Sequence, residues 1–171
     1  MKNLTAESGG SVEGSHLIIR EEEFKKLQSV LRRILLQSHS RVVFLVDKNG
    51  QLLCSVGEEG EYDTTALGSL AAGNIAASGG LARLIGEKEF SILFHQGEKD
   101  NMHISLIDNR VILVAIFDAR TPVGLVRLRV RKSNRDVVRV LEEISSVQEM
   151  LTDDDIIFEE LTDEDIDRLF K

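Results

Sequence analysis

The stretch from Asp63 to Gly86 predicts one long helix whose two faces differ in size and polarity. Asp63 is a favourable N-cap residue and Gly86 a typical stop, so we expect the helix to span 63–85. With 100° per residue, the larger apolar side chains gather on one face, which should pack on a sheet. The residues of that face are Leu67, Leu70, Ala71, Asn74, Ile75, Ser78, Leu81, Ala82 and Ile85.

The opposite face of this predicted helix is built from small residues, and only Arg83 carries a charge there. A helix face that meets water is normally rich in Lys and Glu, and each internal glycine costs roughly 1 kcal/mol relative to alanine. Close packing against a partner, such as the same helix of a second copy, would offset that cost; burial inside the chain's own domain is the alternative. The face consists of Ala66, Ser69, Ala72, Gly73, Ala76 and Gly80.

Two helix patterns and five strand patterns surround this helix. Apolar residues recur every three or four positions over 17–38, which predicts a helix. A continuous apolar run over 41–47 is typical of a central strand. Asn49-Gly50 favours a type I′ turn, which would lead into a partner strand over 51–56.

Strand patterns return over 90–96, 102–108 and 110–117, with turns at 97–101 and 108–109. The segment after them alternates apolar and basic residues like a strand, but Thr121 as N-cap and Pro122 at the first position favour a helix over 122–150.

This order of elements predicts an α/β protein of three layers. A five-stranded antiparallel sheet should carry the central helix on one face and two helices on the other, in the order α-β-β-α-β-β-β-α. Residues 1–16 are expected to form a disordered N-terminus, 17–150 the domain, and 151–171 a tail. Segment 152–171 holds nine acidic residues and two basic ones, a net charge of −7 of the total of −8.

Several of these segments together resemble the Roadblock/dynein-light-chain family, and within it bacterial regulators of cell polarity and motility. The stretches VFLVDKNGQL, AGNIAASGGLA and GLVRLR carry the resemblance, which covers roughly 21–150 and returns in LTDEDIDRLFK at the end. It implies a homodimer that binds one copy of a Ras-like small GTPase and accelerates GTP hydrolysis. It also implies that no arginine finger is inserted, so neither Arg83 nor Arg120 receives that role, although such a residue is common in other activators. The chain would then be a regulator without an active site or cofactor of its own.

The resemblance places GTPase contacts at two sites. On the middle helix they are Ser69, Ala72, Gly73, Ala76 and Gly80, which agrees with the small-residue face. In the tail the resemblance implies a second contact, linked to nucleotide exchange, through Asp163, Asp165, Ile166, Leu169 and Phe170. Thr162 and Asp165 approximate a capping box for this short helix, which is too short to be stable alone and should fold on binding.

A basic ridge is predicted on the last helix, where four arginines recur at intervals of four. One hypothesis is that the acidic tail rests on it; a phosphate or lipid surface is a weaker one, and a solvated ridge paired with Glu142 and Glu143 is the plain alternative. The ridge consists of Arg127, Arg131, Arg135 and Arg139.

Other chemistry finds little support in the sequence. His95 and His103 would face each other across a hairpin, but two ligands are too few for a zinc site, so no metal is expected. No nucleotide-binding glycine motif is present, and aromatic residues at 5% disfavour a stacking nucleic-acid binder. Cys54 is the one cysteine, and no signal-like or membrane-spanning apolar run occurs, so a cytoplasmic protein is expected; the resemblance adds a cell pole.

Two alternatives remain open at this point. A sensor of the PAS-like, profilin-like or longin-like type would have a similar layered fold, but it would need a polar cavity, and Asn74 and Ser78 are the main inward polar residues. A scaffold would bind the GTPase, or another partner, without changing its hydrolysis rate.

Overall fold

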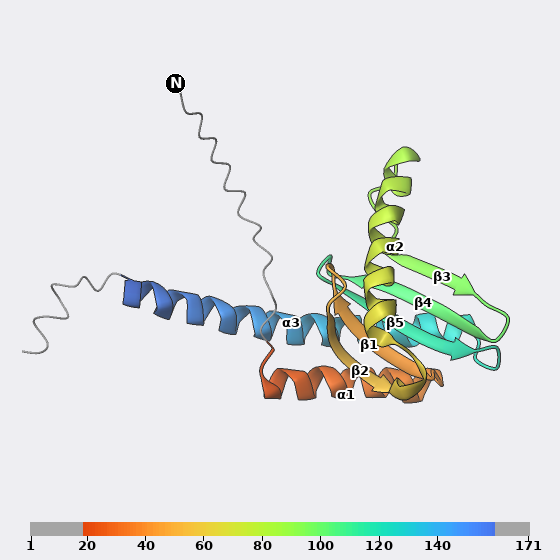
Figure 1. The fold of residues 1–171 in the computed structure, drawn as a ribbon, viewed down its shortest axis with the longest axis horizontal. Helices are drawn as coiled ribbons and strands as arrows, with labels where there is room; N and C mark the ends of the chain where they lie inside the picture. Colours follow the sequence, from red (N-terminus) through yellow and green to blue (C-terminus); the bar gives the residue numbers. More distant parts are fainter. Residues whose placement is uncertain (1–18, 160–171) are drawn as a thin grey trace, which may run out of the picture.

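The computed structural model describes residues 19–159, which form three layers around one sheet (Figure 1). All eight elements predicted from the sequence are present in the predicted order. The elements are α1 (Glu21–Ser38), β1 (Val42–Asp47), β2 (Leu52–Gly57), a 3₁₀ turn η1 (Glu59–Glu61), α2 (Thr64–Leu84), β3 (Ile92–Gln96), β4 (Asp100–Ile107), β5 (Val111–Asp118) and α3 (Val123–Glu159).

The sheet has the strand order β2-β1-β5-β4-β3, and every neighbouring pair is antiparallel. The hairpin β1-β2 and the meander β3-β4-β5 are joined in the middle, where Leu45 of β1 lies opposite Leu113 of β5. α2 crosses one face of the sheet, whereas α1 and α3 lie side by side on the other (Figure 1). The predicted three-layer α/β/α architecture is therefore confirmed.

Each face of the sheet has its own apolar core, because β1 and β5 are buried on both sides. The core under α1 and α3 is the larger one and contains long aliphatic side chains such as Leu31, Ile34 and Leu141. The core under α2 is smaller, and α2 contributes only Ala71, Ala72 and Ile75 to it as buried side chains. Small side chains let a helix approach a sheet closely, so α2 sits tightly on the strands that it does cover.

Two of the three predicted turns differ in detail. Asn49-Gly50 is not a type I′ turn, since Gly50 has φ +87° but Asn49 is not among the residues with positive φ. Instead, the Asp47 carboxylate accepts bonds from the amides of Asn49 and Gln51, and this side-chain arrangement selects a different turn. The turn predicted over 97–101 is shorter, because β4 already begins at Asp100. A two-residue turn with positive φ at both positions occurs at Asp108-Asn109 (φ 51° and 52°).

Two predictions about α3 were also wrong in detail. Thr121 does not cap the helix, because its hydroxyl donates to the carbonyl of His39 (3.2 Å) and so ties the start of α3 to the end of α1. The helix also continues to Glu159 rather than ending near Met150, since no glycine or proline interrupts residues 125–159. Its C-terminal part extends well beyond the sheet (Figure 1).

Candidate functional site

The surface of α2 that faces away from the sheet is the most unusual surface of the molecule. Leu70, Leu81, Leu84 and Ile85 are exposed by 69%, 60%, 84% and 70%. Leu70, Leu81 and Leu84 form one stripe with Gly73 and Ala77 between them, at intervals of three and four residues. Large apolar side chains therefore point outward while small ones point inward, the reverse of what an isolated surface helix needs.

The buried face of α2 is rotated by roughly 60° from the predicted one, given 100° per residue. The predicted inward residues Leu70, Asn74, Leu81 and Ile85 are exposed, so their predicted burial was wrong. The physical reason is close approach: a Cβ added to Gly68 would lie 2.6 Å from Cγ1 of Val46. The helix lays its smallest residues on β1, and the leucines are left outside. The buried residues are Gly68, Ala71, Ala72, Ile75, Ser78 and Ala82.

Four of the five site residues predicted on α2 lie on this outer surface. Ser69, Gly73 and Ala76 are exposed, and Gly80 is partly exposed. An added Cβ at Gly73 or Gly80 would meet no atom within 4 Å. Ala72 is the exception, since it is only 7% exposed and packs in the core under α2. We call the outer surface formed by Ser69, Leu70, Gly73, Ala76, Ala77, Gly80, Leu81 and Leu84 the α2 platform.

The ends of α2 are well defined even though its outer face is bare. The Asp63 carboxylate accepts a bond from the Ala66 amide (2.9 Å), which confirms the predicted N-cap. At the other end Gly86 has φ +82°, and the Glu87 amide donates to the carbonyl of Ala82 (2.9 Å). The helix is thus rigidly bounded, and Arg83 is its one charged residue.

The β3 edge of the sheet lies beside the platform and is also uncovered. α1 packs against β2 at one edge of the sheet. β3 at the other edge exposes Ile92 by 43% and Phe94 by 41%. The C-terminal end of α2 extends beyond the strands on this side (Figure 1). An open strand edge next to exposed leucines is a common site for pairing with another chain.

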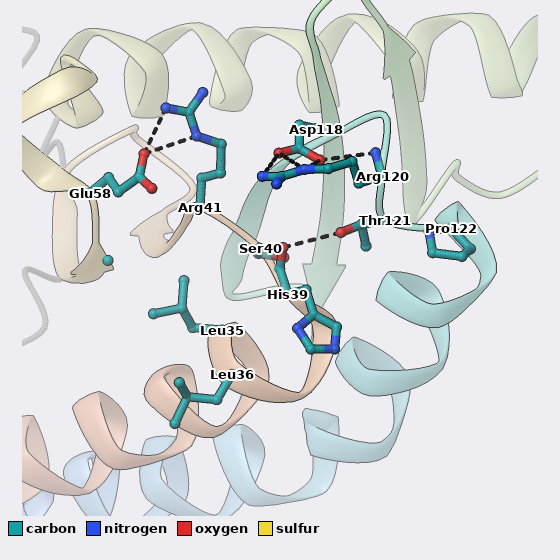
Figure 2. Close-up of a pocket in the computed structure, with 11 residues that line it drawn as sticks. Leu35, Leu36, His39, Ser40, Arg41, Glu58, Asp118, Arg120, Thr121 and Pro122 are labelled. Carbon is teal, nitrogen blue, oxygen red and sulfur yellow. Dashed lines mark hydrogen bonds and ion pairs between the residues drawn. The ribbon is translucent and has the colours of Figure 1, made fainter.

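A hollow of about 650 Å³ lies where α1 ends and β1, β2 and β5 meet its C-terminal end (Figure 2). Its arginines are already engaged. Arg120 donates to Asp118 (2.6 Å), and this pair lowers the pKa of the Asp118 carboxyl and raises the pKa of Arg120. Arg41 donates to Glu58 (2.9 Å), Glu61 (2.8 Å) and Asp100 (3.2 Å).

Arg41 and its hydrogen-bond partners connect segments from different strands. Hydrogen bonds to Glu58 and then to Asp100 raise the pKa of Arg41, and the guanidinium lies 5.4 Å from the centre of the Tyr62 ring. Burial and the hydrogen bond from its hydroxyl to Asp100 raise the pKa of Tyr62. These contacts hold the segment after β2 against the start of β4. Because each guanidinium already faces carboxylates, this hollow is poorly suited to binding a phosphate.

The predicted pairing of His95 with His103 was wrong. β4 begins at Asp100, earlier than predicted, and this shifts the register so that His95 lies opposite Met102 and His103 opposite Phe94. His103 is 1% exposed, and burial, with a smaller contribution from Arg127, lowers its pKa to about 4. Among residues 19–159 no group of three or more His, Cys, Asp or Glu is placed to hold a metal ion.

The basic ridge predicted on α3 is present, and its four arginines are exposed. The predicted pairing with Glu142 and Glu143 does not appear: Glu143 binds Lys26, and Arg139 lies 3.8 Å from Asp136. Among the side chains that the structure describes, which end at Met150, Arg127, Arg131 and Arg135 take part in no ion pair. The second predicted site lies outside the described residues: Asp163, Asp165, Ile166, Leu169 and Phe170.

Comparison with known proteins gives the family. The family model for the Roadblock/LC7 domain matches residues 26–117. The fold is similar to that of Myxococcus xanthus MglB, with 50% sequence identity and a TM-score of 0.70 over 75% of this chain and 96% of that one. The gliding protein MglB of Thermus thermophilus shares 28% identity over 74% of this chain and 96% of its own, with a TM-score of 0.70.

A third solved structure, described as MglB with a tetrameric arrangement, is 27% identical, with a TM-score of 0.71 over 75% of this chain and 96% of that one. A search of curated protein sequences gives no significant match. Among the described residues no helix is long and apolar enough to cross a membrane. The family model spans more than half of the chain, and the likeness to M. xanthus MglB covers nearly all of that protein, so this chain belongs to the Roadblock/LC7 family.

Proposed function

We propose that this protein is a homodimeric regulator of a Ras-like GTPase of the MglA type, and that it binds the GTPase through the α2 platform. The observation that carries the proposal is the inverted arrangement of α2, which keeps glycines and leucines exposed and almost free of charge. The 50% sequence identity to M. xanthus MglB supports the choice of an MglA-type GTPase as the partner. Small residues at 73, 76 and 80 allow another backbone to approach closely.

Dimerisation would complete the platform. The β3 edge is open, and Leu81 and Leu84 are exposed in the last turns of α2, which precedes β3 in the chain. Pairing of two β3 edges would bring the C-terminal halves of two α2 helices together and cover these leucines. Ser69, Gly73 and Ala76 from both copies would then form one surface, which is consistent with two copies of this chain for each GTPase.

The effect on the GTPase is proposed to be faster GTP hydrolysis without an arginine finger. Arg120 is held by Asp118, and Arg83 is the one cation of α2. A regulator of this kind would act by fixing the catalytic groups of the GTPase in place, which is the positioning and electrostatic role that dominates phosphoryl transfer. By the same family argument, the protein would control cell polarity and motility from a cell pole.

The test is the double variant Ala76→Arg/Gly80→Arg, which places two large cations on the platform. We expect GTPase binding to weaken by at least about 100-fold, as for the loss of a central hot spot. The matched control is Ser29→Arg/Gln37→Arg, which adds the same charge to exposed positions of α1 on the other side of the sheet. Binding by titration with the GTP-loaded GTPase would be measured for both; equal affinities would contradict the platform.

The same proteins decide between activator and scaffold. GTP turnover by the GTPase should rise when the wild-type protein or the α1 control is added, and not when the platform variant is added. If the GTPase binds the wild-type protein with an unchanged hydrolysis rate, the protein is a scaffold. If no GTPase binds at all, a sensor that responds to another partner becomes the better interpretation.

The C-terminal tail is proposed as a second GTPase contact that promotes nucleotide exchange. Its sequence combines acids at Asp163 and Asp165 with apolar residues at Ile166, Leu169 and Phe170. Replacing the three apolar residues by Asp should reduce the rate at which the GTPase releases a fluorescent GDP analogue, while binding through the platform persists. An unchanged release rate would remove the tail from the exchange step.

A further inference from the structure

A groove between the β3 edge and the N-terminal half of α3 combines basic and apolar side chains. It has a volume of about 330 Å³ and is lined by Ile92, Gly124, Arg127, Leu128 and Arg131. We call it the β3–α3 groove. It arises because α3 covers β4 and β5 but leaves β3 partly uncovered on this face.

The floor of the groove is apolar and its wall is basic. The antiparallel register puts Ile92 and Phe94 on the face of the sheet that α1 and α3 cover. They are 43% and 41% exposed, and Leu128 opposite them on α3 is 39% exposed. Phe94 does not line the groove itself but continues the exposed apolar strip of β3, and its ring stacks on Phe117 with centroids 6.3 Å apart.

The cations of this wall lack partners within the described part of the chain. Neither Arg127 nor Arg131 forms an ion pair with the described side chains of residues 19–150, and Lys132 and Arg135 continue the positive surface along α3. Other exposed cations of the two helices do pair, as Lys26 does with Glu143 and Arg33 with Asp136. The groove therefore suits an occupant that carries both carboxylates and apolar side chains.

The C-terminal segment of the same chain has this composition. Residues 160–171 contain five acids and two bases, a net charge of −3, together with the apolar residues Ile166, Leu169 and Phe170. The carboxylates of the segment would form ion pairs with the arginines of the groove. Its apolar side chains would pack against Ile92 and Leu128, and against Phe94 beside them. A nucleic acid fits less well, because its phosphates could pair with the arginines but it offers no aliphatic side chains to Ile92 and Leu128.

The length of α3 decides which copy supplies the segment. At 1.5 Å per residue, the 31 residues from Leu128 to Glu159 place the end of the helix roughly 46 Å from the groove. Ile166 is the seventh residue after Glu159, so a fully extended chain carries it back by at most about 25 Å. Phe170, the eleventh residue after Glu159, is carried back by at most about 40 Å, which also falls short of 46 Å. A second copy is therefore the source whose backbone can lie along the whole groove.

We propose that the β3–α3 groove binds the acidic C-terminal segment, residues 160–171, of a second copy of this protein. The contact links copies through a different surface from the α2 platform. It does not require the GTPase, and it stands or falls separately from the proposed function.

The test uses the two lysines that flank the contact, Lys132 beside the groove and Lys171 at the chain end. Heavy-isotope and light copies of the full chain are unfolded together, refolded together and treated with a short amine cross-linker. We expect Lys132–Lys171 cross-links that join a heavy chain to a light one. Cross-links found only within chains of one isotope, or none between these lysines, would overturn the proposal.

Charge reversal shows whether the groove holds the segment. Arg127→Glu/Arg131→Glu should lower the cross-link yield about tenfold, a ratio that corresponds to roughly 1.4 kcal/mol. The control Arg20→Glu/Arg32→Glu makes the same change of net charge at exposed positions of the N-terminal region and should leave the yield unchanged. Adding Asp163→Arg/Asp165→Arg to the groove variant should restore the cross-link; failure of this rescue, with the variant still folded, would overturn the proposal.

Discussion

The two faces of α2 belong to one continuous helix but meet different surroundings. The inner face lies on β1, and Gly68 and Ala71 let it approach so closely that an added Cβ at Gly68 would overlap Val46. The outer face exposes Leu70, Leu81 and Leu84 by 69%, 60% and 84%. The difference teaches that the inner face of α2 stabilises the domain, while the outer face is held out for a partner at the expense of its own burial.

The largest effect should come from truncating one apolar side chain on the inner face, compared with one on the outer face. Ile75 is 8% exposed and belongs to the core under α2, so Ile75→Ala should lower the free energy of unfolding by about 2–4 kcal/mol. Leu84 is 84% exposed, so within one protomer Leu84→Ala should change that free energy by less than about 0.5 kcal/mol. Urea denaturation of both variants measures the contrast.

Protein concentration sharpens this first comparison. If Leu84 is buried between two copies, Leu84→Ala should lower the denaturation midpoint at concentrations that favour the dimer but not on dilution, whereas Ile75→Ala should lower the midpoint at every concentration. Equal losses for the two variants at high dilution, where protomers are separate, would contradict the division of α2 into a packed inner face and a free outer face.

Much of the fold was predictable from local patterns, because each strand and helix follows a simple periodicity. Asp63 as N-cap and Gly86 as stop are confirmed, since capping depends on neighbouring residues alone. The rotation of α2 was not predictable in the same way. An apolar stripe through Leu70 and Leu81 looks like a sheet-facing stripe, and only the distance between Gly68 and Val46 shows that small residues are needed there.

The errors elsewhere share that origin in non-local contacts. Thr121 was predicted to cap α3, but its hydroxyl instead donates a hydrogen bond to the carbonyl of His39, which is far away in the sequence. His95 was misplaced because an early start of β4 changes the register of a whole hairpin by one residue. An outer surface of small, uncharged residues on α2 could be predicted from the composition of the helix. Ala72 was wrongly predicted to belong to it, because its burial depends on where the sheet lies.

A smaller effect, of opposite sign on the two faces, is expected from adding one methyl group to a glycine. At Gly68 the new Cβ would lie 2.6 Å from Cγ1 of Val46 and 3.3 Å from the Gly50 carbonyl oxygen, so Gly68→Ala forces the helix or the strand to move. Overpacking of this kind costs about 1–3 kcal/mol, which exceeds the gain of roughly 1 kcal/mol from alanine's higher helix propensity. At Gly80 nothing lies within 4 Å, so Gly80→Ala keeps the gain without the cost.

Thermal unfolding measures this difference between the two glycines, with a lowered midpoint expected for Gly68→Ala and a raised one for Gly80→Ala. A midpoint for Gly68→Ala as high as that of the wild-type protein would contradict the close seating of α2 on β1. A lowered midpoint for Gly80→Ala at concentrations that favour the dimer, but not on dilution, would mean that a second copy fills the space beside Gly80. That result would place this glycine in the contact between copies, because only an intermolecular neighbour disappears on dilution.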